Sequence, residues 1–140
     1  MTTAPTSSEE ARIAHLGMVQ GVISRVASDA QNSRTLAITL AAAMIAIAQT
    51  GSNATPWLAG LGIAPTLLFW WQNAFALHVE RSYRNLYDEV RHGRIIEPFT
   101  MDWRSCLHSA PPWRTALEFV VALPFATVVV ILAVIAKVTA

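Results

Sequence analysis

Few side chains in this sequence could do chemistry, and their spacing forms no catalytic or metal-binding pattern. The chain has one cysteine, Cys106, which excludes an internal disulfide. Asp88 and Glu89 are adjacent acids within a helical stretch, which is typical of a solvated face. The sequence contains no glycine-rich phosphate loop and no nucleophile elbow. Zinc-ligand spacing is also absent from the four histidines, which are His15, His78, His92 and His108. We therefore predict no enzyme activity, no catalytic residues, no metal and no cofactor.

Two adjacent amides stand out because they lie in otherwise apolar surroundings. Gln72 and Asn73 follow Trp70 and Trp71 near the end of a long uncharged run. Amide side chains in such surroundings hydrogen-bond between helices or line a water-filled path. We predict that Gln72 and Asn73 contact a neighbouring helix or line a pore, with exposure near a membrane interface as the remaining alternative.

The composition favours a membrane protein. Hydrophobic residues make up 54% of the 140 residues and charged residues 14%, against about 25% charged in ordinary soluble domains. No charged residue occurs from Thr35 to Val79. A turn at 51–56 divides this run, so we predict transmembrane helices at 34–50 and 57–79, and a third at 115–137.

The segments outside these runs are expected to lie in the cytoplasm. Residues 1–10 are predicted to be disordered, 11–31 to form an amphipathic helix and 94–114 to form a connector, in which Trp103 and Trp113 suit a membrane interface. Residues 80–93 extend the second span as a helix that ends near Gly93. One face of this extension has an aromatic and aliphatic stripe, which consists of Tyr83, Leu86, Tyr87 and Val90. We expect this stripe to pack on residues 11–31 or on a partner.

The distribution of basic residues predicts the orientation. Nine arginines lie before the first span or between the second and third, whereas Lys137 follows the third. The positive-inside rule then places the N-terminus in the cytoplasm and the C-terminus outside a bacterial inner membrane. The predicted fold is all-α: an integral membrane protein with three transmembrane helices, an N-terminal amphipathic helix and a cytoplasmic extension of the second span. The net charge of +1 gives no support to a nucleic-acid partner.

Two segments resemble a known family. Residues 15–27, HLGMVQGVISRVA, and residues 80–91, ERSYRNLYDEVR, flank an uncharged hairpin, and together they resemble small bacterial membrane proteins of the SLATT type. The similarity covers residues 10–138, and the third predicted span is an addition to the two-span plan of that family. It implies a homo-oligomer in the lipid bilayer that perturbs the membrane or forms a pore in conflict or antiphage systems when a cytoplasmic sensor responds. The alternative function is a non-enzymatic accessory or scaffold subunit bound to another membrane protein.

Overall fold

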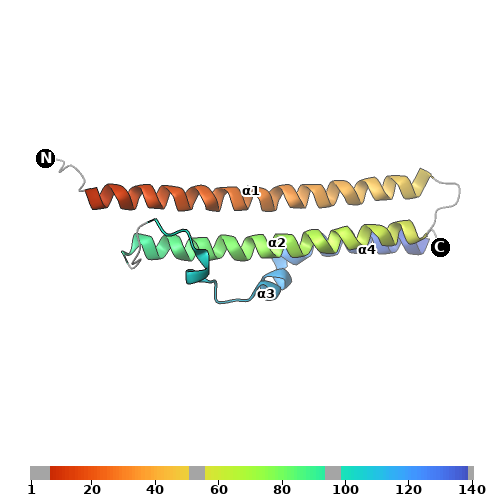
Figure 1. The fold of residues 1–140 in the computed structure, drawn as a ribbon. Coiled ribbons are helices and arrows are strands. Elements are labelled where there is room, and N and C mark those ends of the chain that lie inside the picture. Colours follow the sequence, from red (N-terminus) through yellow and green to blue (C-terminus); the bar gives the residue numbers. More distant parts are fainter. Residues whose placement is uncertain (1–6, 51–55, 94–98, 139–140) are drawn as a thin grey trace.

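The computed structural model describes residues 7–50, 56–93 and 99–138, and these form an all-helical rod (Figure 1). The elements are α1 (Ser7–Thr50), α2 (Pro56–Arg91), the 3-10 helix η1 (Trp103–Cys106), α3 (Pro112–Leu117) and α4 (Phe119–Val138). The prediction of an all-α fold is confirmed. Helices α1 and α2 lie side by side and antiparallel, and α4 packs on the N-terminal part of α2 (Figure 1).

Helix α1 is continuous, whereas the sequence predicted separate helices at 11–31 and 34–50. Glu9 and Glu10 lie in its first turn, where acidic side chains interact favourably with the helix dipole. Two polar residues near the junction of the two predicted segments lie within the continuous helix, and their side chains bond to its backbone. The Ser33 hydroxyl donates to the Asp29 carbonyl at 2.9 Å, and the Thr35 hydroxyl donates to the Gln31 carbonyl at 3.2 Å.

The prediction of three membrane-spanning helices is wrong. Within the residues that the structure describes, none of the helices combines the length and apolar character that a bilayer crossing needs. The apolar part of α1 begins only after Arg34, and Gln72 and Asn73 interrupt that of α2. The uncharged stretch of α4 ends before Lys137 in its last turn, at the lower limit of the roughly 17–25 residues that one span requires.

The core consists of two clusters, one towards one end of the rod and one near the middle of α2. Towards one end, Val19 and Ile23 of α1 pack against Leu86 and Val90 of α2. Where α2 meets α3 and α4, the buried residues are Ala74, Ala116 and Val121, with Trp70 and Leu77 packed against them.

Helices α2 and α4 approach closely at Gly62. A Cβ atom on this residue would lie 3.3 Å from Leu132 Cδ1, and Leu132 itself is buried. The absence of a side chain therefore allows the contact that holds the two helices together at this end of the rod.

Residues 99–118, here called the connecting segment, return from the end of α2 to its middle. Helix α2 ends at Arg91, and Gly93 adopts a φ of 69°, the left-handed conformation that commonly follows a helix. Asp102 caps η1, because its carboxylate accepts a hydrogen bond from the Arg104 backbone N–H at 3.0 Å. The chain then breaks its helical course at Glu118, where ψ is 138°, so the single predicted helix at 115–137 is two helices, α3 and α4.

Residues 1–6, 51–55, 94–98 and 139–140 lie outside the described part of the chain. The predicted disordered N-terminus and external turn fall largely on these residues, as does the start of the predicted connector.

Candidate functional site at the boundary between a polar and an apolar half

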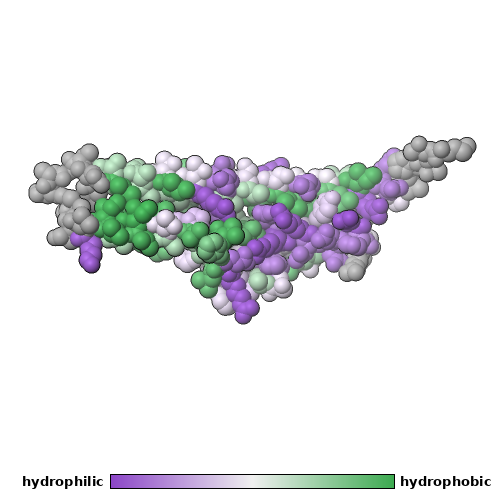
Figure 2. Space-filling model, turned by 180° about the vertical axis from the view of Figure 1, so that it is seen from behind, coloured by the Kyte–Doolittle hydropathy of each residue, from purple (hydrophilic) through white to green (hydrophobic). Residues whose placement is uncertain are grey.

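Exposed apolar side chains are concentrated at one end of the rod. We call residues 35–47, 61–71 and 119–135 the apolar half; none of them is charged. The polar half consists of residues 7–34, 72–93 and 99–118. Figure 2 shows hydrophobic residues gathered at this end and hydrophilic residues over much of the rest. The exposed large side chains of the apolar half are Leu36, Ile38, Leu40, Ile47, Leu61, Leu67, Leu68, Trp71, Phe119, Val120, Leu123, Val130, Ile131 and Val134. A contiguous apolar surface of this kind is unusual in a monomer and marks a place where another surface binds.

A buried polar contact lies where the two halves meet. Arg34 Nη2 donates to Asn73 Oδ1 at 3.1 Å, and Asn73 Nδ2 donates to the Ala30 carbonyl at 3.2 Å. Asn73 is fully buried, whereas its neighbour Gln72 is exposed. The structure therefore places Asn73 in a contact between α1 and α2 and turns Gln72 away from it. The two adjacent amides therefore lie in different environments, one buried between helices and one exposed.

Arg34 is incompletely paired at this position. Its Nε atom is buried and has no hydrogen-bond partner among the described residues. A guanidinium with an unsatisfied donor is costly to bury, so the bond to Asn73 is important for keeping this charge at the edge of the apolar half.

An ion pair fixes the start of α4 on α2. Arg81 donates to Glu118 through both terminal nitrogens, each at 2.5 Å. Hydrogen bonding to Arg81 lowers the pKa of Glu118, against the opposing effect of partial burial. The same bonds raise the pKa of Arg81. Because both side chains remain about one-third exposed, with relative areas of 29% and 37%, we assign the pair a small role in stability and a larger one in position.

The connecting segment is held on α2 by further hydrogen bonds. Trp70 Nε1 donates to the Ala116 carbonyl at 3.0 Å, which attaches α3. The backbone N–H of His108 donates to Ser82 Oγ at 3.0 Å. The Trp103 ring lies edge-on to the buried His78 ring at 6.4 Å. The segment thus lies beside residues 70–82 of α2, next to the boundary between the halves.

Two tryptophan–arginine pairs lie on this segment. The Arg104 guanidinium is 5.8 Å from the Trp103 ring centroid, and the Arg114 guanidinium is 5.3 Å from the Trp113 ring centroid. Both distances are within the range of cation–π contacts. The two tryptophans were predicted to suit a membrane interface, but their pairing with arginines was not predicted, although the Trp-Arg dipeptide occurs at both places in the sequence.

The predicted stripe on α2 is covered within the chain. Leu86 and Val90 are buried against α1, and Tyr83 and Tyr87 pack at the edge of the same cluster. The Tyr83 hydroxyl donates to the Met101 carbonyl at 3.4 Å. The stripe was predicted to pack on the N-terminal helix or on a partner. Helix α1 and the connecting segment cover it in the structure.

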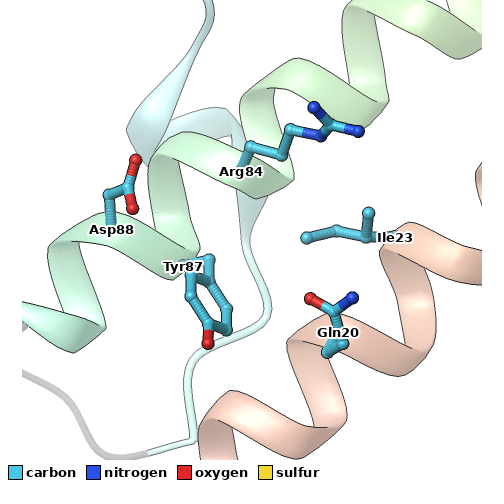
Figure 3. A pocket seen from close by; sticks show the side chains of 5 residues that line it. All are labelled: Gln20, Ile23, Arg84, Tyr87 and Asp88. Atoms are coloured by element: carbon cyan, nitrogen blue, oxygen red, sulfur yellow. The ribbon is translucent and has the colours of Figure 1, made fainter.

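A small cavity opens beside this stripe, between α1 and α2 (Figure 3). It has a volume of about 260 Å³ and is lined by Gln20, Ile23, Arg84, Tyr87 and Asp88. Arg84 is paired with Glu80 at 2.6 Å. The lining has no nucleophile with an adjacent base, and the cavity is smaller than most ligand sites, which hold about 300–1,000 Å³. Among the described residues, no group of three or more histidine, cysteine or acidic side chains could hold a metal ion.

Comparisons with models of protein families, with curated proteins and with solved structures find no match to this chain.

Proposed function

We propose that this protein is a non-enzymatic protein that binds a lipid bilayer through its apolar half and perturbs the membrane. The observation that supports the proposal is the separation of exposed side chains along the rod: the apolar half exposes leucine, isoleucine, valine and phenylalanine and has no charged residue. Contact of this kind needs no helix that crosses the bilayer. Helices with a lipid-facing apolar surface bury it about 5–10 Å into the boundary between head groups and acyl chains.

Transfer of this apolar surface from water into lipid is favourable in free energy. Removing apolar area from water contributes roughly 25 cal/mol per Å², or about 1.5–3 kcal/mol for each large aliphatic side chain that becomes fully buried. Leu68 is 65% exposed, Val120 is 66% exposed and Phe119 is 75% exposed, so these side chains gain much of that amount on transfer into lipid. Several such side chains together are sufficient for stable binding.

The resemblance of residues 15–27 and 80–91 to SLATT-type proteins supports a more specific form of the proposal. On this view the protein acts at the bacterial inner membrane, with the polar half in the cytoplasm, and its copies associate there. The effect of that association is loss of the membrane potential in a conflict or antiphage response, triggered by a cytoplasmic sensor.

The proposal is tested with two single-charge variants that differ in position. Leu68→Glu places a charge in the apolar half, and Met18→Glu places one in an exposed apolar position of the polar half, where Met18 is 52% exposed. Membrane potential is followed with a voltage-sensitive dye in bacteria that express each chain at equal abundance. We expect the parent and Met18→Glu to depolarise the cells and Leu68→Glu to lose most of the effect. Equal depolarisation by all three chains would contradict the proposal.

The accessory or scaffold function is the second candidate. It is favoured if the parent chain binds membranes but leaves the potential unchanged, including after co-expression of a cytoplasmic sensor. The burial of the α2 stripe under α1 limits this alternative, because the surface expected to hold a partner is already in contact with α1 and the connecting segment.

A further inference from the structure

The two tryptophan–arginine pairs lie on the same part of the molecule, beside residues 70–78 of α2. Trp113 and Arg114 belong to α3, which packs beside Trp70 and Ala74 of α2. Trp103 contacts His78. Positions 70 and 78 of one helix are about 12 Å apart along its axis, so the two pairs lie within roughly two helical turns of each other.

The side chains of this region combine apolar and cationic groups. Arg104, Trp113 and Arg114 are exposed, as are two neighbouring leucines, Leu107 at 55% and Leu117 at 65%. Tryptophan is enriched at the interface between lipid and water, and a guanidinium binds phosphate oxygens through two parallel hydrogen bonds. Asp102 is the acidic residue nearest in sequence, and its carboxylate caps the backbone of η1.

This region also continues directly into the apolar half. Glu118 joins α3 to α4, and its bonds to Arg81 hold the junction on α2. Phe119 and Val120, which follow at once, are strongly exposed apolar residues. Any bilayer that covers the start of α4 therefore brings its head groups next to Arg114 and Arg104.

We propose that Trp103–Arg104 and Trp113–Arg114 form a binding surface for the phosphates of anionic lipid head groups. The inference rests on the proposed contact between the apolar half and lipid, and it assigns to the connecting segment the preference for anionic membranes. The tryptophan rings lie at the level of the interface, and each arginine, held over its neighbouring ring, extends to a phosphate. Binding fixes how deeply the apolar half enters the membrane.

The test uses co-flotation of the full chain with two kinds of vesicle. One kind is phosphatidylcholine alone, and the other contains phosphatidylglycerol as well. The parent is compared with Arg104→Gln/Arg114→Gln and with Arg12→Gln/Arg25→Gln, a control that removes the same charge from exposed positions of α1. At physiological salt, charges farther than about 8 Å from the head groups are largely screened, and Arg25 lies roughly 13 Å along the helix from Arg34. Circular dichroism verifies that all three chains have the same helix content.

We expect the parent to bind neutral vesicles and to bind anionic vesicles more tightly. An arginine near an anionic surface contributes about a fivefold increase in partitioning, so Arg104→Gln/Arg114→Gln should bind anionic vesicles about 25-fold less tightly, with little change on neutral ones. The control should keep the parent's preference.

The possible failures separate the two proposals. A parent that floats with neither vesicle contradicts the proposed function itself. A parent that binds neutral vesicles but shows no anionic preference, or a double variant that keeps that preference, overturns the inference and leaves the proposed function in place. Equal losses of binding to anionic vesicles in the double variant and in the control also overturn the inference, because binding would then depend on the net charge of the chain.

Discussion

Replacing Asn73 by leucine removes the polar contact between α1 and α2 with little change in side-chain shape. The amide group accepts a bond from Arg34 and donates one to the Ala30 carbonyl, and it is fully buried. Leucine can form neither bond. The Arg34 guanidinium then loses a partner in a place where its Nε atom already has none among the described residues.

The expected cost follows from the two bonds. A hydrogen bond to a charged group contributes about 1.5–3 kcal/mol and a neutral one about 0.5–1.5 kcal/mol, so the combined loss is roughly 2–4.5 kcal/mol. Burial of the apolar leucine side chain offsets about 1.5 kcal/mol of this. We therefore expect Asn73→Leu to lower the free energy of unfolding by about 0.5–3 kcal/mol.

The assay is chemical denaturation in mild detergent, followed by far-ultraviolet circular dichroism. Gln72→Leu is the matched control, because Gln72 is exposed and its substitution should change the free energy of unfolding by less than about 0.5 kcal/mol. A double-mutant cycle with Arg34→Met isolates the contact, and the coupling energy should exceed about 1 kcal/mol. An Asn73→Leu chain as stable as the parent, or additive effects of the two substitutions, would refute the role assigned to this contact.

Three further predictions concern the packing and the helix ends. Leu86→Ala should lower the free energy of unfolding by about 2–3 kcal/mol, as measured by urea denaturation. This value is near the lower end for a buried leucine, because the two helices can partly close the cavity that the substitution leaves. The Arg81–Glu118 pair should stabilise the docked α4 above about pH 4.3, the ordinary pKa of glutamate, and this contribution should disappear as the pH falls through the lowered pKa of Glu118. Protease sensitivity of α4 should therefore rise in acid in the parent but not in Glu118→Gln. Gly93→Ala should destabilise the protein by about 1–2 kcal/mol, because φ is positive at this residue. Gly21 lies within a helix with open space around it, so Gly21→Ala should stabilise the protein by about 0.5–1 kcal/mol. The melting temperatures of the two variants should therefore shift in opposite directions.

Local sequence signals were sufficient to predict the helical class and the course of α2. The apolar run passes into residues 80–91 without a helix breaker, and Gly93 follows the last turn, as the structure has it. The same signals missed the continuity of α1, in which the Ser33 and Thr35 hydroxyls bond back to the preceding turn.

Contacts between distant residues could not be predicted from the sequence. Arg34 and Asn73 are 39 positions apart, and their bond depends on the register between two helices. The break at Glu118 has no glycine or proline to mark it and coincides with the bonds from Arg81. The prediction of spans failed because counting uncharged residues gave too little weight to Gln72 and Asn73, which interrupt the apolar stretch of α2.

The most direct test of the account is to locate lipid along the rod. The single Cys106 allows a Cys106→Ser background, into which Leu68→Cys or Met18→Cys is introduced and labelled with a fluorophore. Vesicles that contain nitroxide-labelled acyl chains then quench any label that lies in lipid. We predict strong quenching at position 68 and little at position 18. Equal quenching at the two positions, or none at position 68 in chains that float with the vesicles, would contradict the claim that the apolar half is the part that binds the membrane.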